Sequence, residues 1–317
     1  MAEGTALNTA AFGAVDAMAQ AIVQRHAADY ADFSAQPVPA PSIPENEADP
    51  VYLGALKACS ALGFIAHDAE ALAQAWAAQT RRTGAFDAAH WPVEPADFGL
   101  QPQPCAHPFA ACPRDLGLYA VLPDAVWVGR MAQAGVPTVQ LRYKSTDAAA
   151  IEREIDAAVR AVQGTGALLF INDHWRQAIA AGAYGVHLGQ EDLDALQPDE
   201  LAFIRNAGLR LGVSTHGYAE MVRADRASPS YIAMGAIYPT TLKKMATVPQ
   251  GVARLRAYAR LMRDYPQVAI GGIGLAQFEQ VLQSGVGSIA VVRALVNAQQ
   301  PEAAAQELMQ ALSRHRA

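Results

Sequence analysis

Cysteine is scarce in this chain, with three residues in 317, namely Cys59, Cys105 and Cys112. Their spacing matches no zinc-binding or redox motif, and an odd number does not suggest a disulfide framework. A protein of the reducing cytoplasm is the simplest interpretation.

A long apolar run and an excess of positive charge are also missing. No segment approaches the roughly twenty apolar residues that span a bilayer. The opening residues, MAEGTALNTA, lack the basic start and apolar core of a signal peptide. The formal net charge of −6 argues against general affinity for nucleic acid and against a polybasic membrane-binding surface. We therefore expect small-molecule ligands and no nucleic-acid or membrane partner. The oligomeric state stays open, and a homo-oligomer is one option.

The composition is that of an ordinary globular protein, with 52% hydrophobic and 17% charged residues. Residues 1–114 form a distinct first region. Alanine-rich amphipathic segments predict helices over about residues 9–25 and 51–80. Proline-rich runs at 36–50 and 91–113 break regular structure. We predict a helical accessory region with proline-rich linkers.

Residues 115–317 show short apolar strands alternating with helix-length amphipathic stretches, which is typical of a parallel α/β sheet. Strands are predicted at 116–122, 138–143, 167–172, 185–188, 210–214, 231–237, 267–271 and 288–292. Helices are predicted, for example, at 149–162, 198–207, 252–264 and 303–313. Eight repeats predict a (β/α)8 TIM barrel over 115–317. A doubly wound open sheet is the alternative, but Leu122-Pro123-Asp124 stands where its glycine-rich loop would be expected.

Long polar side chains close the second predicted strand in QLRYK, residues 140–144. Because residues alternate sides along a strand, Gln140, Arg142 and Lys144 should share one face. Arginine and lysine together suit a multiply charged anion. An exposed edge strand with solvated charges explains this pentapeptide equally well when it is considered alone.

The other strand ends add to this set, because barrel active sites form at the carboxyl ends of the strands. Asn172 and Asp173 end the third predicted strand, and Asp192 follows the fourth in GQED. The two carboxylates are hard ligands suited to Mg²⁺ shared with phosphate oxygens. Taken singly, Asp173 could be a turn residue and Asp192 a helix cap. The remaining strand ends supply Ser214, His216, the run YPTTLKK at 238–244, the glycines at 271–274 and Arg293.

The ordered motifs resemble those of the thiamine phosphate synthase family. They read VQLRYK, FINDH, GVHLGQEDL, LGVSTH, AIYPTTLKK, AIGGIG and IAVVRAL, and the resemblance covers residues 116–314. It implies a transferase of thiamine biosynthesis on a TIM barrel. That enzyme couples hydroxymethylpyrimidine diphosphate to hydroxyethylthiazole phosphate, giving thiamine phosphate and diphosphate in a Mg²⁺-dependent dissociative substitution.

The resemblance also implies roles for individual residues. The pyrimidine diphosphate would be held by Gln140, Arg142, Lys144, Asn172, Ser214 and Lys243, of which Arg142, Lys144, Ser214 and Lys243 would be catalytic. Metal binding would fall to Asp173 and Asp192. The thiazole phosphate would be held by Thr240, Thr241, Gly272, Val292 and Arg293. Leu242 and Arg293 stand where the family commonly has threonine and serine, which affects the thiazole side only.

Two other functions stay open at this point. A thiazole tautomerase-like isomerase would use His216 as an acid–base group, and a non-catalytic phosphate-binding barrel would use the same cations without turnover. His187 lies mid-strand and is expected to pack or hydrogen-bond internally. The loop 241–250 carries Lys243 and is the expected lid.

Overall fold

A computed structural model describes residues 2–43, 48–101, 107–240 and 247–316, and within these ranges it describes the side chains of residues 13 to 315. The chain divides into two compact units. Unit 1 comprises Met1–Gln101 together with Gly217–Val222, and unit 2 comprises Pro102–His216 and Arg223–Ala317. Within the described residues, the structure contains no helix with the combined length and apolar character that a membrane span requires.

Unit 2 is built on a closed barrel of eight parallel strands, in which each strand pairs with the next along the chain and β8 pairs with β1. The strands are β1 (Leu118–Leu122), β2 (Thr138–Leu141), β3 (Leu168–Asn172), β4 (Gly185–Leu188), β5 (Arg210–Thr215), β6 (Tyr231–Met234), β7 (Gln267–Ile270) and β8 (Ser288–Val291). This confirms the predicted (β/α)8 TIM barrel and excludes the doubly wound open sheet.

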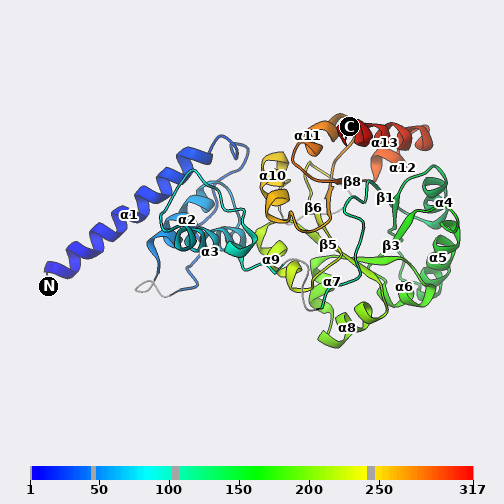
Figure 1. Cartoon of the computed structure of the whole chain (residues 1–317), viewed down its shortest axis with the longest axis horizontal. Helices are drawn as coiled ribbons and strands as arrows, with labels where there is room; N and C mark the ends of the chain where they lie inside the picture. Colours follow the sequence, from blue (N-terminus) through cyan, green and yellow to red (C-terminus); the bar gives the residue numbers. More distant parts are fainter. Residues whose placement is uncertain (1, 44–47, 102–106, 241–246, 317) are drawn as a thin grey trace. The chain divides into compact units, whose positions relative to one another are not determined.

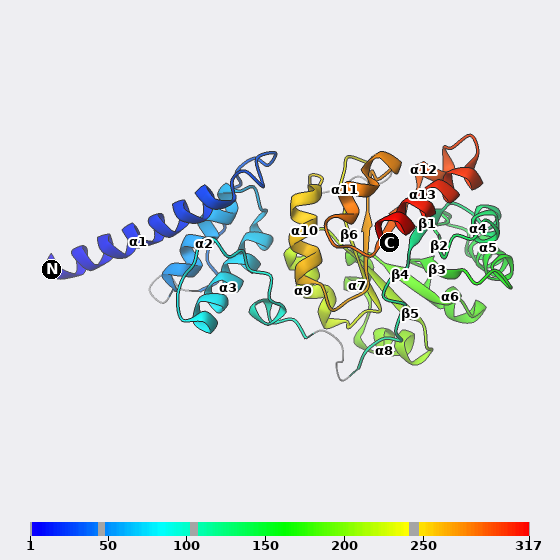
Figure 2. The ribbon, with the colours of Figure 1, turned by 45° about the horizontal axis from the view of Figure 1, so that its top comes forward.

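Helices surround the ring of strands, as Figures 1 and 2 show. They are α4 (Ala125–Gln133), α5 (Ala148–Ala161), α6 (Trp175–Ala181), α7 (Gln190–Ala195), α8 (Pro198–Asn206), α9 (Tyr218–Arg226), α10 (Gly251–Leu261), α11 (Phe278–Leu282), α12 (Arg293–Val296) and α13 (Pro301–Arg316), with the short 3-10 turn η2 (Leu275–Gln277) before α11. The first residues of α9 belong to unit 1.

Several strands end earlier than their apolar runs predict. The run 231–237 becomes a strand only to Met234. Beyond it, the carbonyl of Ala236 accepts a hydrogen bond from the backbone N of Gln250 at 2.8 Å, and the backbone N of Ile237 still donates to the carbonyl of Ile270 at 3.0 Å. Similarly, β2 ends at Leu141, so only Gln140 of QLRYK's polar residues lies within the strand. The strand-alternation argument therefore does not extend to Arg142 and Lys144.

Large side chains fill the barrel interior. Tyr119, Phe170 and Tyr231 are buried together, with ring centroids of Tyr119 and Tyr231 5.9 Å apart. Room for them comes from a residue without a side chain on β5: a Cβ at Gly212 would lie 2.1 Å from Cζ of Tyr231. The barrel is thus a packed core, and its polar interior groups must find partners within it.

Unit 1 contains α1 (Ala2–His26), α2 (Pro50–Ala61), α3 (Ala66–Thr83) and the 3-10 turn η1 (Pro95–Phe98). The prediction of a single helix over 51–80 is wrong, because α2 ends at Ala61 and a new helix, α3, begins at Ala66. Gly63 stands at the break with φ of +83°, and a Cβ there would lie 2.5 Å from Cβ of Phe33. The left-handed conformation and the close packing both require glycine.

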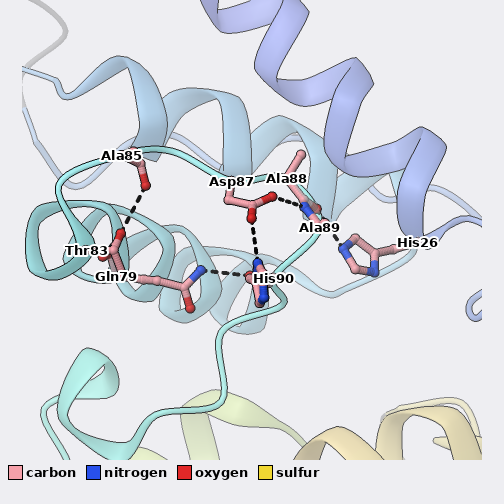
Figure 3. A network of polar contacts seen from close by, with 8 residues as sticks. All are labelled: His26, Gln79, Thr83, Ala85, Asp87, Ala88, Ala89 and His90. Atoms are coloured by element: carbon pink, nitrogen blue, oxygen red, sulfur yellow. Dashed lines mark hydrogen bonds and ion pairs between the residues drawn. The ribbon is translucent and has the colours of Figure 1, made fainter.

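Polar contacts fix the segment that follows α3 (Figure 3). Gln79 donates from Nε2 to the carbonyl of His90 at 2.7 Å, and the Asp87 carboxylate accepts from the backbone N of Ala89 at 2.8 Å. The bond from Ala89 is the main reason that the pKa of Asp87 is lowered, and His90 adds to it. The ring of His26, at the end of α1, bonds the carbonyl of Ala88 at 3.0 Å, and burial lowers the pKa of this histidine.

Tyr218 is fully buried within unit 1. Trp91 donates from Nε1 to its hydroxyl at 2.9 Å, and the Phe98 ring stacks on it with centroids 5.4 Å apart. The neighbouring backbone N of Ala219 donates to Asp68 at 2.9 Å. The segment Gly217–Val222 is therefore built into the core of unit 1, although it follows strand β5 directly in sequence.

Candidate active site at the carboxyl ends of the strands

The carboxyl ends of parallel barrel strands open on one mouth. Because all eight strands are parallel, those predicted residues after β2 to β8 that the structure describes stand at that mouth. Gln140 and Asn172 lie just inside it, on adjacent strands, and Gln140 donates from Nε2 to Asn172 Oδ1 at 2.9 Å. Both are buried, at 4% and 9% exposure, so they form the floor of the candidate site.

A cation and two carboxylates lie above this floor. Lys144 Nζ is 3.0 Å from Asp173 Oδ2, and the charge of Asp173 lies near enough to Asp192 to raise the pKa of the Asp192 carboxyl. Asp173 adopts a left-handed φ of 65°, and its backbone N donates to the carbonyl of His187 at 3.0 Å. The structure thus brings together the lysine after β2, the aspartate after β3 and the aspartate after β4.

The Asp192 carboxyl has a raised pKa. Burial is the largest cause, and the nearby Asp173 charge adds to it, while the hydrogen bond from the backbone N of Gly189 acts in the opposite direction. That bond, 2.9 Å to Asp192 Oδ2, is the helix-cap contact considered from the sequence. The capping contact therefore coexists with a close pair of carboxylates, which is the environment that a divalent cation stabilises.

The donor set fits Mg²⁺ in part. Two carboxylates supply hard oxygen ligands, and Mg²⁺ is usually held by one or two carboxylates plus substrate phosphates and water. Across the part of the chain that the structure describes, no group of three or more His, Cys, Asp or Glu side chains is arranged to hold a metal ion. Asp173 and Asp192 would therefore supply only part of an ion's coordination.

Asp192→Asn is expected to stabilise the metal-free protein slightly at neutral pH. Folding raises the pKa of Asp192, so its contribution favours folding at low pH and is lost as the pH rises through the folded-state pKa. Asparagine removes the charge but can still accept the bond from Gly189. We expect thermal unfolding in EDTA at about pH 7.5 to shift upward by about 1–2 °C, a small effect because the side chain is partly exposed. The gain should vanish near pH 3, and a lower melting temperature at pH 7.5 would contradict this explanation.

The thiazole-side candidates lie on the later strands. Gly272 has φ of +68°, and a Cβ there would lie 2.7 Å from the carbonyl oxygen of Pro239, which places it against the loop that leads to Thr240. Val292 is half-buried after β8, and Arg293 is exposed at the start of α12. Thr241, Leu242 and Lys243 lie outside the described residues, as does most of the expected lid.

Arg142 is half-buried just beyond β2. Its backbone N donates to the carbonyl of Leu122 at 2.8 Å, which anchors the main chain of QLRYK to the end of β1. Its role toward a phosphate group stays a prediction.

Two polar residues at the site, Gln190 and Arg223, were not singled out from the sequence, and they extend the contacts of Ser214 and His187. Ser214 Oγ is 2.8 Å from His187 Nε2, and the carbonyl of Ser214 accepts from Gln190 Nε2 at 2.7 Å. Gln190 accepts in turn from Arg223 Nε at 2.8 Å. The expectation that His187 hydrogen-bonds internally is confirmed. Alternation along GVHL would have placed its ring inside the barrel, but no sequence signal identifies its partners.

The barrel that carries this site is similar in sequence to known proteins. The family model for thiamine monophosphate synthase matches residues 119–295, more than half of the chain and nearly the whole barrel. The chain belongs to the thiamine monophosphate synthase family. The family resemblance found in the motifs is thereby confirmed.

Individual members of the thiamine monophosphate synthase family agree with this assignment. The thiamine-phosphate synthase of Neisseria meningitidis serogroup B is 56% identical over 188 residues, covering 59% of this chain and 90% of that protein. The thiamine-phosphate synthase of Cronobacter sakazakii is 51% identical over 202 residues, covering 64% of this chain and 95% of that protein. A solved thiamine phosphate pyrophosphorylase from Pyrococcus furiosus superposes with a TM-score of 0.56 at 27% identity, covering 64% of this chain and 98% of that one.

Proposed function

We propose that this protein couples hydroxymethylpyrimidine diphosphate to hydroxyethylthiazole phosphate, forming thiamine phosphate and releasing diphosphate. Membership of the family and the names of its relatives support a transferase of this type. The observation that carries the proposal is the cluster of Lys144, Asp173 and Asp192 at the barrel mouth, next to buried Gln140 and Asn172.

Charge accounts for the proposed chemistry. The leaving diphosphate gains negative charge as its C–O bond breaks, and groups placed in advance around it lower that barrier. Lys144 and Arg142 would stabilise this charge, together with Lys243. Mg²⁺ held by Asp173 and Asp192 would supply Lewis-acid stabilisation of the same oxygens. The aminopyrimidine supports the cation that remains, and the thiazole nitrogen attacks it.

A protein nucleophile is not required in this route. Ser214 and His187 are in contact, but His187 Nδ1 meets the hydroxyl of Tyr231 at 2.7 Å, where a serine hydrolase has a carboxylate. We therefore assign Ser214 to substrate binding. Thr240, Gly272, Val292 and Arg293 would hold the thiazole phosphate, with Thr241.

The test is a coupling assay with the full chain. Both substrates and Mg²⁺ are mixed with the protein, and the thiamine phosphate and diphosphate that form are measured. If the proposal holds, the two products form in equal amounts. A chelator should stop the reaction and added Mg²⁺ should restore it. Isomerisation of the thiazole without coupling would support the tautomerase alternative, and binding without turnover would support the non-catalytic one. The family and the curated relatives favour neither.

Residues 1–114 are proposed to be an accessory region outside the barrel. The relatives from Neisseria and Cronobacter are almost completely covered by a match that spans 59–64% of this chain, so most of this chain's extra length has no counterpart in them. Small-molecule substrates are the expected partners.

A further inference from the structure

A continuous chain of hydrogen bonds, buried except at its half-buried Ser214 end, crosses the barrel interior beneath the candidate site. It links side chains from six strands, in the order Asn172, Gln140, Tyr119, Tyr231, His187 and Ser214. Asn172, Gln140 and Ser214 are proposed to bind the pyrimidine substrate, whereas Tyr119, Tyr231 and His187 have no assigned role. Because each hydroxyl carries one hydrogen, the direction of donation at one end constrains every later bond.

The direction is set at the Gln140 end. Gln140 donates from Nε2 to Asn172 Oδ1, so its Oε1 accepts, and Tyr119 donates its hydroxyl hydrogen to that oxygen at 2.9 Å. Tyr119 then has no hydrogen left for Tyr231, whose hydroxyl lies 2.7 Å away. Tyr231 must therefore donate to Tyr119.

Counting the available hydrogens in the same way sets the direction of the remaining bonds as far as Ser214. With its hydrogen committed to Tyr119, the oxygen of Tyr231 can only accept at His187 Nδ1, 2.7 Å away, so Nδ1 carries a hydrogen, which is the only ring hydrogen when the imidazole is neutral. His187 Nε2 is then an acceptor, and Ser214 must donate its hydroxyl hydrogen to it across 2.8 Å. Ser214 Oγ retains only lone pairs for a ligand.

Packing holds the side chains of this hydrogen-bond chain in place. Tyr231 is fully buried, and the missing side chain at Gly212 is what gives its ring space, since a Cβ there would lie 2.3 Å from the hydroxyl oxygen. Burial is the largest cause of the raised pKa of both Tyr119 and Tyr231, so both phenols keep their hydrogens. On the other side, Gln190 bonds the Ser214 carbonyl and orients this residue.

We infer that Tyr119, Tyr231 and His187 are positioning residues that make Ser214 a hydrogen-bond acceptor toward an N–H group of the substrate. The exocyclic amine of an aminopyrimidine offers such a group, whereas diphosphate oxygens can only accept. This inference rests on the proposed function for its substrate. The direction of the hydrogen-bond chain can be measured without any substrate.

The first test reads the tautomer of His187 by two-bond ¹H–¹⁵N correlation in the ligand-free full chain at about pH 8, well above the ordinary histidine pKa. His187→Gln identifies the signals by their loss. We expect hydrogen on Nδ1. In Tyr119→Phe the Tyr231 hydroxyl loses its acceptor and should donate to His187 Nδ1 instead, which moves the ring hydrogen to Nε2. Hydrogen on Nε2 in the unaltered protein, or no change in Tyr119→Phe, would overturn the inference.

The second test is kinetic. Tyr119→Phe should lower kcat/KM for the pyrimidine diphosphate about tenfold, the effect of one hydrogen bond, and leave KM for the thiazole phosphate unchanged. The matched control is Tyr265→Phe, which also removes a buried hydroxyl, here one that donates to Asp225 Oδ1 at 2.6 Å. Tyr265→Phe should lose about as much stability as Tyr119→Phe, but it should change neither the tautomer of His187 nor the kinetics of coupling.

The outcomes separate this inference from the proposed function. If the unaltered protein couples both substrates but Tyr119→Phe matches it kinetically, the acceptor role of Ser214 fails and the proposed function stands. If the unaltered protein does not couple them while His187 carries its hydrogen on Nδ1 and shifts as expected, the proposed function fails and the direction of the hydrogen-bond chain stands.

Discussion

Asp192→Ala is expected to lower the rate of thiamine phosphate formation by at least about 100-fold, with the fold intact. The substitution removes one of the two carboxylates that interact at the barrel mouth, and with it one of the two proposed metal ligands. Lys144 would remain paired with Asp173 at 3.0 Å, so the loss should fall on metal binding and turnover. Steady-state coupling rates at several Mg²⁺ concentrations measure it.

Glu191→Ala is the matched control for this prediction. Glu191 is the adjacent carboxylate on the same helix α7, and it is exposed. Its loss should change the rate less than about twofold, because exposed charges contribute little. Excess Mg²⁺ should recover part of the activity of Asp192→Ala if Asp173 still holds the ion. A near-normal rate in Asp192→Ala would remove the proposed metal role of this residue.

Tyr218→Ala is expected to destabilise the protein by roughly 3–5 kcal/mol, the usual cost of deleting a buried aromatic side chain. Tyr218 is fully buried, stacks on Phe98 with an interplanar angle of 9°, and accepts from Trp91. Removing it would leave a cavity and an unsatisfied indole N–H in unit 1. Urea unfolding followed by tryptophan fluorescence measures the change in the free energy of unfolding.

Two further variants show where that loss originates. Tyr218→Phe keeps the ring and should cost only about 1 kcal/mol, because it removes the hydroxyl that Trp91 contacts. Phe203→Ala deletes an aromatic ring that is 58% exposed, and it should change stability by less than about 0.5 kcal/mol. If Tyr218→Ala were as mild as Phe203→Ala, Tyr218 would not be part of the core that the contacts describe.

The barrel was predictable from the sequence because its signal is local. Short apolar runs alternate with amphipathic helices, and each run indicates a strand without knowledge of its neighbours. The positions of Asp173 and Asp192 at the barrel mouth were predictable as well, because the carboxyl ends of parallel barrel strands all lie at one mouth. The predicted helix 51–80 was wrong because an alanine-rich amphipathic pattern continues through Gly63. The packing of that glycine against Phe33 is a contact between distant residues.

The family, the eight strands and the charged residues at their ends were predictable from the amino-acid sequence, because each depends on residue types at short spacing. The burial of Tyr218 in unit 1 and the connection of Tyr119 to His187 through Tyr231 became visible only in the folded chain. Alternation along a strand tells which face a side chain occupies, but not which atoms it meets across a closed barrel. These side-chain contacts depend on the register of the paired strands and on the space left by Gly212, which are properties of the assembled fold.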